Sequence, residues 1–600
     1  MLGTKHIEGH ISIKEYATSG RIFRPFPLLV FVLFALPVGL GVIGAMLPAL
    51  GYFPALGGNS FSLDYFHQFI AYPGVGRSII LTLWTGLVAT ILSFFLSQLI
   101  CAVCMNRTWF RWVRRFLGPI LSIPHISISL GLLYLIAPSG WIIRPFAILF
   151  GIDQQDWYYV PDAYGLALIW GLIIKEVPFL LLISMTALRQ IPAHRSLRVA
   201  RGFGYGEVAG WFTFILPQIY GRIRFPIWAV LVFSISVADM ALVLIPVNQP
   251  TLSMLVLRWY SDADLNYQFL AAFGAIAQVL LTVLSIVLWI IFEKIGHQWL
   301  KYRIKDGIRN FLGEWGERLI TALTHSLTFL VALCGTGSIL ILGLWSISGR
   351  WRFPDLIPSI LSVRYWERHW DNLGHLMFNS LSIALVSSAL SLVLVIGCLE
   401  AQQSFTASSG RKQNRKTGFT LLGMGGLKWW RMVIYLPLLL PQLAFLFGVQ
   451  LLALSVGLDG MWFGVVWGHM LFVLPYMYLS LSGSFLDFDM RYVQAARALG
   501  KSPLEILFKI KLPMMLNPIL VAFAVGVAVS IAQFLPTLFI GAGRVDTLTL
   551  EAVSLASGGD RRVAGVYAFI QAVLPFFAFA IAAVIPAWFY RNKSGMRGHR

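Results

Sequence analysis

Charged side chains are scarce in this 600-residue sequence, because Asp, Glu, Lys and Arg together make up only 12% of it. A soluble globular protein usually has about a quarter of its residues in that class. Hydrophobic residues instead account for 58%, and the mean hydropathy is +0.75. This composition excludes an ordinary soluble domain and indicates an integral membrane protein.

Potential metal ligands are also few. The only four cysteines lie within or at the ends of apolar stretches, at Cys101, Cys104, Cys334 and Cys398. The spacing of Cys101 and Cys104 is half of a zinc or redox motif, but no second Cys pair or His pair accompanies it. His125 and His469 are isolated, with no carboxylate or cysteine at ligand spacing. We therefore expect no metal site and no cofactor, and we interpret the cysteines as ordinary helix residues.

Long apolar segments are the main feature of the sequence. A bilayer core requires about 20 apolar residues per helix, and twelve segments reach roughly that length. They are 26–50, 76–104, 116–137, 163–187, 222–246, 268–293, 318–347, 376–400, 430–455, 460–483, 515–540 and 564–590. The first is too long, and too poor in a small-residue cleavage site, for a removable signal peptide. The sequence predicts an all-α integral membrane protein with about twelve transmembrane helices.

Basic residues outnumber acidic ones, 46 to 26, which gives a net charge of +20. If the N-terminus is cytoplasmic, 35 of the basic residues belong to the seven cytoplasmic segments and 10 to the six outer connections, while Lys175 lies within a span. Cytoplasmic loops are expected to be rich in Lys and Arg. The distribution predicts cytoplasmic N- and C-termini, and it accounts for the charge without a nucleic-acid partner.

The sequence repeats itself at a distance of about half its length. Arg198-Val-Ala-Arg-Gly-Phe-Gly204, followed by Phe214-Ile-Leu-Pro217, resembles Gln494-Ala-Ala-Arg-Ala-Leu-Gly500, followed by Ile510-Lys-Leu-Pro513. The two prolines are 296 residues apart. Such self-similarity indicates two copies of one unit.

The predicted units are residues 1–300 and 301–600, with six spans each. Because six is an even number, both copies point the same way through the membrane, related by a pseudo-twofold axis along its normal. A polar stretch at 401–429, rich in Ser, Gly, Lys and Arg, has no counterpart in the first half. We predict a mobile solvated loop there, without chemistry of its own.

Leu499-Gly-Lys-Ser502, within the second copy of the repeat, matches the end of a nucleotide-binding P-loop. A P-loop also requires a glycine five residues before Gly500, where this chain has Ala495. No strand precedes the motif, and the stretch is a short helix between two spans. The sequence therefore excludes phosphate binding at this position.

The same stretch resembles the EAA motif of ABC-importer permeases, in which Glu-Ala-Ala, three residues, Gly and nine further residues precede Ile-x-Leu-Pro. The matching residues are Ala495, Ala496, Gly500, Ile510, Leu512 and Pro513 in the second copy, and Ala200, Gly204, Leu216 and Pro217 in the first. The glutamate of the motif is replaced by Gln494 and Arg198. Twelve spans in two such halves resemble the fused permeases of the ferric-iron and thiamine type.

The resemblance implies a type I importer fold and a role for each motif-bearing loop, about 188–221 and 484–514, in coupling to an ATPase. It implies two copies of a cytoplasmic ABC ATPase, a periplasmic solute-binding protein and a bacterial inner membrane as the location. The chain itself would be a carrier and not an enzyme. Small residues at these positions let a short helix lie close against another backbone, and Gly500 permits a turn.

Charged residues inside the predicted spans are the candidate translocation path. Lys175 and Glu176 are near the middle of the fourth span, and Asp239 lies in the fifth, with Gln533 as its approximate counterpart in the second half. A charge at the bilayer centre costs about 2.5–3.5 kcal/mol on insertion scales. These side chains therefore either line a path for substrate or hold helices together.

Two other classes of function remain open at this point. An ion-coupled secondary transporter with parallel halves could use Lys175, Glu176 and Asp239. A membrane-embedded enzyme is disfavoured, because no Ser/His/Asp grouping, His-rich cluster or paired-carboxylate motif is present. Ferric iron, thiamine, another organic cation and a polyamine all remain possible substrates.

Overall fold

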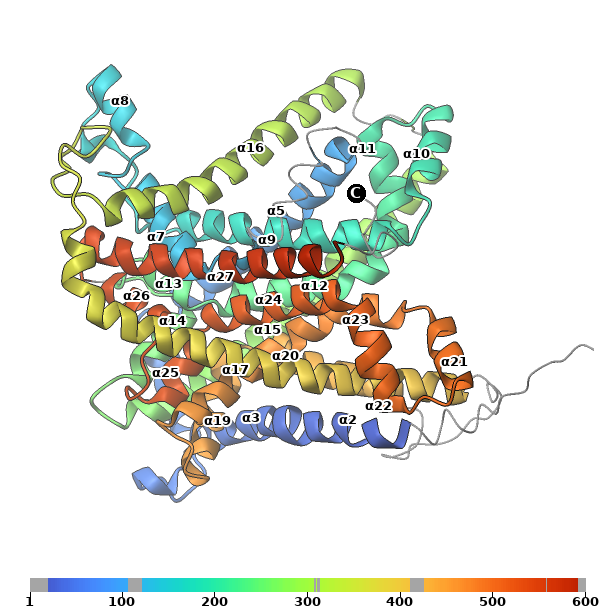
Figure 1. Cartoon of the computed structure of the whole chain (residues 1–600). Helices are drawn as coiled ribbons and strands as arrows, with labels where there is room; N and C mark the ends of the chain where they lie inside the picture. Colours follow the sequence, from blue (N-terminus) through green and yellow to red (C-terminus); the bar gives the residue numbers. More distant parts are fainter. Residues whose placement is uncertain are drawn as a thin grey trace, which may run out of the picture.

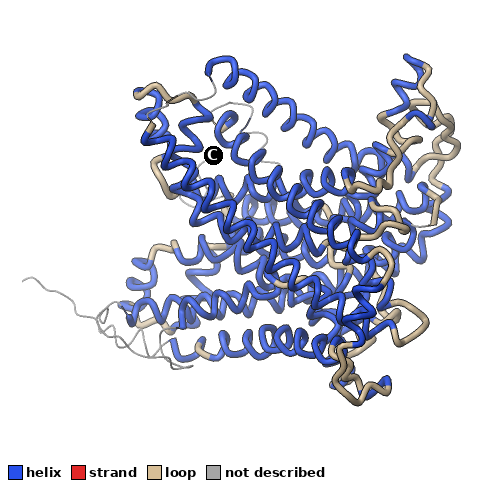
Figure 2. Tube along the Cα trace, turned by 180° about the vertical axis from the view of Figure 1, so that it is seen from behind, coloured by secondary structure: helices blue, strands red, loops and turns tan. Residues whose placement is uncertain are grey.

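The computed structural model describes residues 20–105, 110, 121–306, 309, 313–409, 426–556 and 558–591. Within these ranges the chain is helical and contains no β-strand (Figure 2). The long helices lie side by side and run in a common direction, as expected for a membrane-spanning bundle (Figure 1). Nine helices of the described part are long and apolar enough to cross a bilayer, or up to eleven if each strongly bent pair is one span.

The helical elements of the first half of the sequence begin with a continuous apolar helix made of α2, the π-helical turn η2 and α3. The elements are η1 (Gly20–Phe23), α2 (Pro25–Val30), η2 (Phe31–Ala35), α3 (Leu36–Ala49), η3 (Pro54–Leu56), α4 (Asp64–Ala71), α5 (Val75–Cys104), α7 (His125–Ile136), α8 (Ile143–Phe150), η4 (Gln154–Asp156), α9 (Leu166–Leu188), α10 (Ala193–Gly202), α11 (Glu207–Gly210), η5 (Trp211–Ile215), α12 (Leu216–Ser236), α13 (Asp239–Leu244), α14 (Leu252–Tyr260) and α15 (Tyr267–Lys305).

The helices of the second half follow a similar order. They are α16 (Gly313–Ser346), α17 (Arg364–Ser409), α18 (Gly426–Leu439), α19 (Gln442–Ser455), α20 (Trp462–Leu486), α21 (Met490–Ala498), α22 (Pro503–Ile506), η6 (Leu507–Lys511), α23 (Leu512–Met514), α24 (Leu516–Ile531), α25 (Leu535–Gly541), α26 (Leu548–Ala556) and α27 (Arg561–Phe589). Helices α10, α11, α21 and α22 lie at one end of the bundle, and α8, α25 and α26 lie at the other (Figure 1).

The predicted fifth span, 222–246, is not one helix. It breaks where Val237 takes an extended backbone conformation, so Asp239 begins the separate helix α13 and does not lie within the fifth helix as expected. The predicted span 515–540 is also broken, between α24 and α25. Hydropathy cannot reveal such breaks, because a broken span buried among other helices remains apolar.

The predicted ninth span, 430–455, is also interrupted. Its two helices, α18 and α19, meet at an angle of 115°. Pro441, which caps α19, has no backbone N–H to continue the hydrogen-bond pattern of α18. In the first half, Pro124 caps α7 in the same manner.

Several predicted ends of helices differ from those in the structure. Helix α17 continues to Ser409, so the first part of the predicted loop 401–429 is helical, and α18 begins at Gly426. Residues 410–425 of that predicted loop lie outside the described part of the chain. For the predicted span 116–137, the described helix is α7, and residues 116–120 likewise lie outside the description.

The first helix of each half packs against the other half. Helix α3 lies against α19, and α16 lies against α7. A Cβ atom added to Gly448 of α19 would collide with the carbonyl oxygen of Gly41 in α3, and one added to Gly131 of α7 would collide with that of Ser338 in α16. Glycine at these crossings lets two helix backbones approach closely. The hydrophobic core is therefore shared between the halves.

Candidate functional site

The first candidate loop leaves α9 and returns to the bundle at α12. Helix α10 buries Ala200 and exposes Arg198, and the loop continues through α11 and the π-helical turn η5. Leu216, half-buried, and Pro217, exposed, then begin α12. The motif residues of the first copy therefore all belong to one loop, whose helices α10 and α11 project from the end of the bundle (Figure 1).

The second candidate loop has the same construction. Helix α21 exposes Gln494 and Ala495 and buries Ala496. The π-helical turn η6 follows, 296 residues after η5, and Ile510 within it packs with the small apolar cluster that contains Ala496. Leu512 and Pro513, both half-buried, come next in α23.

The two glycines of the motif are required by backbone conformation. Gly204 has φ +83° and Gly500 has φ +74°, in the left-handed region that favours glycine. The N–H of each bonds a carbonyl three residues earlier, Gly204 to Arg201 at 2.9 Å and Gly500 to Arg497 at 2.8 Å. A Cβ at Gly500 would meet nothing within 4 Å.

The alanines behave differently from expectation. Ala200 and Ala496 are 3% and 5% exposed, so their small size serves packing within their own loops. The close approach of a partner's backbone, expected at these positions from sequence, is therefore not what the structure requires of them.

An exposed apolar side chain precedes each glycine, and the sequence analysis missed both. Phe203 is 60% exposed and Leu499 is 79% exposed, at equivalent positions of the two loops. A signal was available in the sequence, since both copies of the repeat have an apolar residue directly before the glycine. Exposed apolar groups on short surface helices are suited to the groove of a protein partner.

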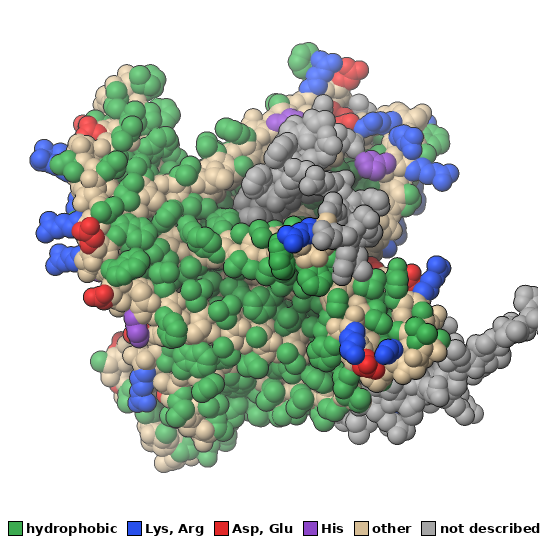
Figure 3. All heavy atoms as spheres, in the orientation of Figure 1, with side chains coloured by type: hydrophobic (Ala, Val, Ile, Leu, Met, Phe, Trp, Pro, Cys, Tyr) green, Lys and Arg blue, Asp and Glu red, His purple; other side chains and the backbone are tan. Residues whose placement is uncertain are grey.

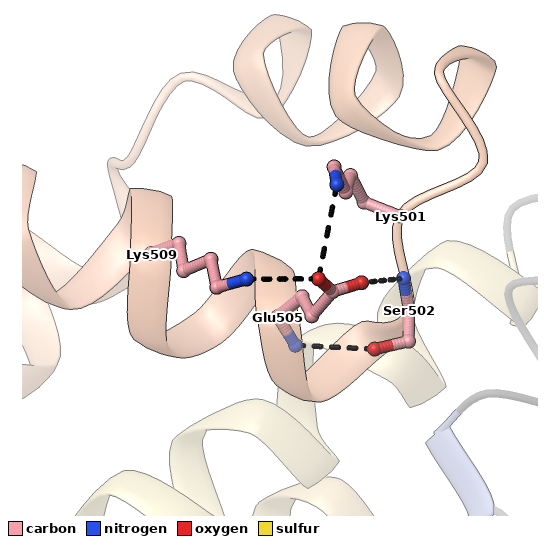
Figure 4. Close-up of polar contacts among 4 residues, drawn as sticks. All are labelled: Lys501, Ser502, Glu505 and Lys509. Carbon is pink, nitrogen blue, oxygen red and sulfur yellow. Dashed lines mark hydrogen bonds and ion pairs between the residues drawn. The ribbon is translucent and has the colours of Figure 1, made fainter.

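The second loop is stiffened by a capping box at the start of α22 (Figure 4). The Ser502 hydroxyl accepts a bond from the Glu505 N–H at 3.3 Å, and the Glu505 carboxylate accepts one from the Ser502 N–H at 3.2 Å. The Lys509 ammonium lies 3.0 Å from the same carboxylate, and that of Lys501 lies 3.8 Å away. Hydrogen bonding from Lys509 and Ser502, with both positive charges, lowers the pKa of Glu505 to about 2.

The first loop is held by other contacts. The N–H of Glu207 donates to the carboxylate of Glu317 in α16 at 3.2 Å. A Cβ on Gly206 would collide with that carboxylate, so a larger residue there would displace the Glu317 side chain. Arg201 pairs with the side chain of Glu207. The two loops therefore share a backbone path but differ in their supports.

Lys511, in η6, makes a buried contact that the sequence analysis also missed. Its ammonium lies 2.5 Å from Oε1 of Glu400 and 2.5 Å from Oε1 of Gln403, both in α17, and 4.0 Å from the ring centre of Phe485 in α20. The first loop has Ile215 at the equivalent position, fully buried. No sequence pattern connects Lys511 with residues 108 and 111 positions away.

The charged residues of the candidate path lie near one another. Lys175 is buried and donates to the backbone carbonyls of Leu121 at 3.0 Å and Ile123 at 2.6 Å. Glu176 and Asp239 both act electrostatically on Lys175. The ammonium of Lys175 is thus satisfied by the backbone preceding α7, which favours helix packing as its role.

The acidic residues of the candidate path, Asp239 and Glu176, make fewer hydrogen bonds than Lys175. Asp239 accepts a bond from the N–H of Met240 at 2.9 Å, at the break before α13. Glu176 is 6% exposed and has no hydrogen bond or ion pair to the described residues. Its carboxylate acts electrostatically on Tyr476 of the second half. Gln533 lies at the equivalent break in the second half, before α25.

The histidines are engaged elsewhere. His469 bonds the hydroxyls of Ser530 at 2.8 Å and Thr537 at 2.9 Å, and the ring of His125 lies 4.6 Å from that of Phe233. The four cysteines are buried and form no disulfide with one another, and Sγ of Cys104 lies 3.8 Å from Nδ1 of His325. Across the described ranges, no three His, Cys, Asp or Glu residues are grouped so that they could hold a metal ion.

A polytopic helical bundle with broken spans, buried charged residues within its helices and two matching surface loops at one end is the architecture of a membrane-transport subunit. Comparison with known proteins agrees. Residues 426–592 match the family model described as the inner membrane component of binding-protein-dependent transport systems.

Two relatives define the family more closely. The chain is 30% identical over 540 residues to the inner membrane ABC transporter permease protein YnjC of Escherichia coli, covering 89% of this chain and 93% of the relative. It is 22% identical over 224 residues to the spermidine/putrescine transport system permease protein PotC of Haemophilus influenzae, covering 37% and 81%. The chain belongs to the ABC transporter permease family, and it is a transport subunit and not an enzyme.

Proposed function

We propose that this permease forms the membrane path of an ATP-driven importer in a bacterial inner membrane. The observation that carries the proposal is the pair of equivalent loops at one end of the bundle, each with a short helix, a glycine of positive φ, a π-helical turn and Leu-Pro. Each loop presents one exposed apolar residue, Phe203 or Leu499. Two copies of a cytoplasmic ATPase subunit dock there, one per loop.

The two loops belong to two copies of one unit, residues 1–300 and 301–600. Matching tertiary contacts support this division. The N–H of Leu252 donates to the hydroxyl of Thr82 at 2.9 Å, and the N–H of Leu548 donates to that of Ser380 at 2.9 Å. The reciprocal crossings of α3 with α19 and of α16 with α7 also support it. Parallel halves would carry both loops and both chain termini on the same side of the membrane, and the excess of Lys and Arg supports the cytoplasmic side.

The solute is a small cation, received from a periplasmic binding protein. Glu176 and Asp239 support this class, because acidic side chains buried between helices attract positive charge. The name of one relative, which specifies spermidine and putrescine, is consistent with it. Ferric iron, thiamine and polyamines all fall within the class.

The decisive experiment reconstitutes the permease in proteoliposomes with a candidate ATPase and a candidate binding protein from the same organism. Uptake of labelled spermidine, thiamine and ferric iron is measured with and without internal ATP. We expect uptake of one of them to require all three proteins and ATP, with two ATPase copies copurifying per permease. Uptake driven by an ion gradient without the ATPase would overturn the importer assignment.

A further inference from the structure

Helix α8 and its flanking loop form a prominence at the end of the bundle opposite α10 and α21. The connection between α7 and α9 spans residues 137–165, whereas the corresponding connection between α19 and α20 spans only residues 456–461. The prominence extends sideways past the long helices, at the level where they end (Figure 1). A projection at that level runs along the surface of the bilayer.

The exposed surface of α8 is entirely apolar. Four side chains of the helix are exposed, namely Phe146 at 41%, Ile148 at 52%, Leu149 at 73% and Phe150 at 69%. Its one charged residue, Arg144, is 2% exposed. A docking site for a protein carries hydrogen-bonding groups around its apolar core, and α8 exposes none.

The residues around α8 have the composition of a membrane–water interface. Trp141, Tyr158, Tyr159 and Tyr164 are all at least 40% exposed. Trp and Tyr are enriched where a protein crosses from acyl chains to headgroups. The adjoining α16–α17 loop adds the exposed arginines Arg350 and Arg352, and the start of α17 adds Arg364 and Arg368; the same segments also expose Asp355 and Glu367. Basic side chains at this level favour anionic lipid headgroups.

The distribution of these side chains is one-sided. Figure 3 shows hydrophobic side chains on the flank of the prominence that faces along the bundle, and charged side chains of both signs along the outer edge of this end of the molecule. An apolar flank toward the bilayer with a charged edge toward water is the arrangement of an interfacial helix.

Arg144 holds the prominence in place. Its guanidinium donates to the carbonyls of Arg352 at 3.0 Å and Ser139 at 3.2 Å, and it lies 4.5 Å from the ring centre of Trp351. The indole N–H of Trp141 donates to the carbonyl of Leu356 at 3.1 Å. The prominence is therefore fixed to the loop between α16 and α17 and does not hang freely.

We propose that α8 is a membrane-surface anchor whose exposed apolar side chains enter the leaflet at this end of the bundle. The lipid bilayer is its partner. Through Arg144 and Trp141, the anchor also fixes the α16–α17 loop relative to the membrane surface. This inference depends on the chain spanning a membrane and not on the direction of transport or the identity of the solute.

Site-directed spin labelling in proteoliposomes of phosphatidylethanolamine and phosphatidylglycerol tests the proposal. The native cysteines are buried, so Leu149→Cys and Phe150→Cys can be labelled in the natural chain, with unlabelled wild type as the background control. Gln155→Cys, at an exposed polar position after α8, is the matched control. Collisions are measured with oxygen, which concentrates among acyl chains, and with a water-soluble nickel chelate.

We expect the ratio of oxygen to nickel collisions to be several-fold higher at Leu149 and Phe150 than at Gln155. Equal ratios at the three positions would overturn the anchor. A second outcome would also overturn the anchor. If Leu149 and Phe150 have water-like collision ratios, and nickel accessibility falls at both positions only when the binding protein is added, the surface is a protein docking site instead.

Discussion

The ammonium of Lys511 lies 2.5 Å from the carboxylate of Glu400, and this contact ties the second surface loop to the end of α17. Both side chains are buried, with 3% and 11% exposed. Movement of the loop must therefore carry α17 with it or break a buried ion pair. The first loop, with Ile215 at the equivalent position, has an apolar contact in place of this pair.

Removing one partner of this pair should be costly. Lys511→Met leaves the Glu400 carboxylate buried without its partner, and such changes destabilise by about 3–5 kcal/mol. The double variant Lys511→Met/Glu400→Leu should recover much of that loss, measured by thermal unfolding in detergent. Ile215→Met in the first loop is the control, expected to cost less than about 1.5 kcal/mol. Equal instability of the single and double variants would show that the pair does not hold the loop.

The crossing of α3 with α19 leads to a second prediction. Gly448→Ala places a methyl group against the carbonyl of Gly41, so the backbones must separate, at a cost of about 1–3 kcal/mol. Gly131→Ala should have a similar effect at the crossing of α7 with α16. Gly39→Ala, two residues from Gly41 in α3 and with nothing within 4 Å of its added Cβ, should be neutral. If all three unfold at the same temperature, the crossings are looser than described.

Phe203 and Leu499 should contribute to binding of the ATPase. Leu499→Asp and Phe203→Asp put a charge where an apolar contact is expected, and because both side chains are exposed the fold should be unaffected. Copurification of the ATPase and substrate-stimulated hydrolysis should both fall, since the coupling free energy is shared by the two partners. Val456→Asp, 61% exposed in the connection between α19 and α20, is the control. Full ATPase binding by both variants would place the docking surface elsewhere.

Lys175 and Glu176 are neighbours in sequence with different expected roles. Lys175→Leu removes the donor to two backbone carbonyls, and leaving such buried groups unsatisfied costs about 1–3 kcal/mol each, so stability should fall. Glu176→Gln replaces a buried carboxyl group that makes no hydrogen bond to the described residues, so uptake should fall with little change in stability. Unfolding temperature and initial uptake rate distinguish the two. Unchanged uptake by Glu176→Gln would remove this residue from the path.

The lowered pKa of Glu505 predicts a pH dependence. Because the folded-state value, about 2, lies below the ordinary value of 4.5, the ionised carboxylate stabilises the start of α22 fully above about pH 4.5. That contribution declines as the pH falls toward 2. Glu505→Gln should therefore speed hydrogen exchange at the amides of α22 at pH 7, and it should do so equally at pH 6 and 8. A difference that varies between pH 6 and 8 would implicate another group.

Much of the fold could be predicted from the sequence. A bilayer requires about 20 apolar residues per span whatever the tertiary packing, so the segment 76–104 corresponds to α5 and 460–483 to α20 within a few residues. The two surface loops were also predictable, because a glycine in the left-handed region and a proline at a helix start are local requirements. Gly204, Gly500, Pro217 and Pro513 meet those requirements in the structure.

Other features depend on contacts between distant parts of the chain. The break before Asp239 and the bend at Pro441 leave hydropathy unchanged, because the freed backbone groups are buried among helices instead of exposed to lipid. The sequence predicts that Ala496 is small so that a partner's backbone can approach it, but in the structure Ala496 packs against side chains of its own loop. Local sequence cannot distinguish these two uses of a small residue.

The sequence by itself determined that apolar segments of membrane-spanning length recur along the chain, and where the two motif-bearing loops lie, since these depend on residue spacing and on transfer of side chains into a bilayer. Tertiary structure alone decided that Lys175 bonds carbonyls preceding α7, that Lys511 pairs with Glu400, and that α3 packs on the opposite half. Each of these contacts joins residues more than 50 positions apart, and the free energy that selects them arises only when both partners are desolvated together.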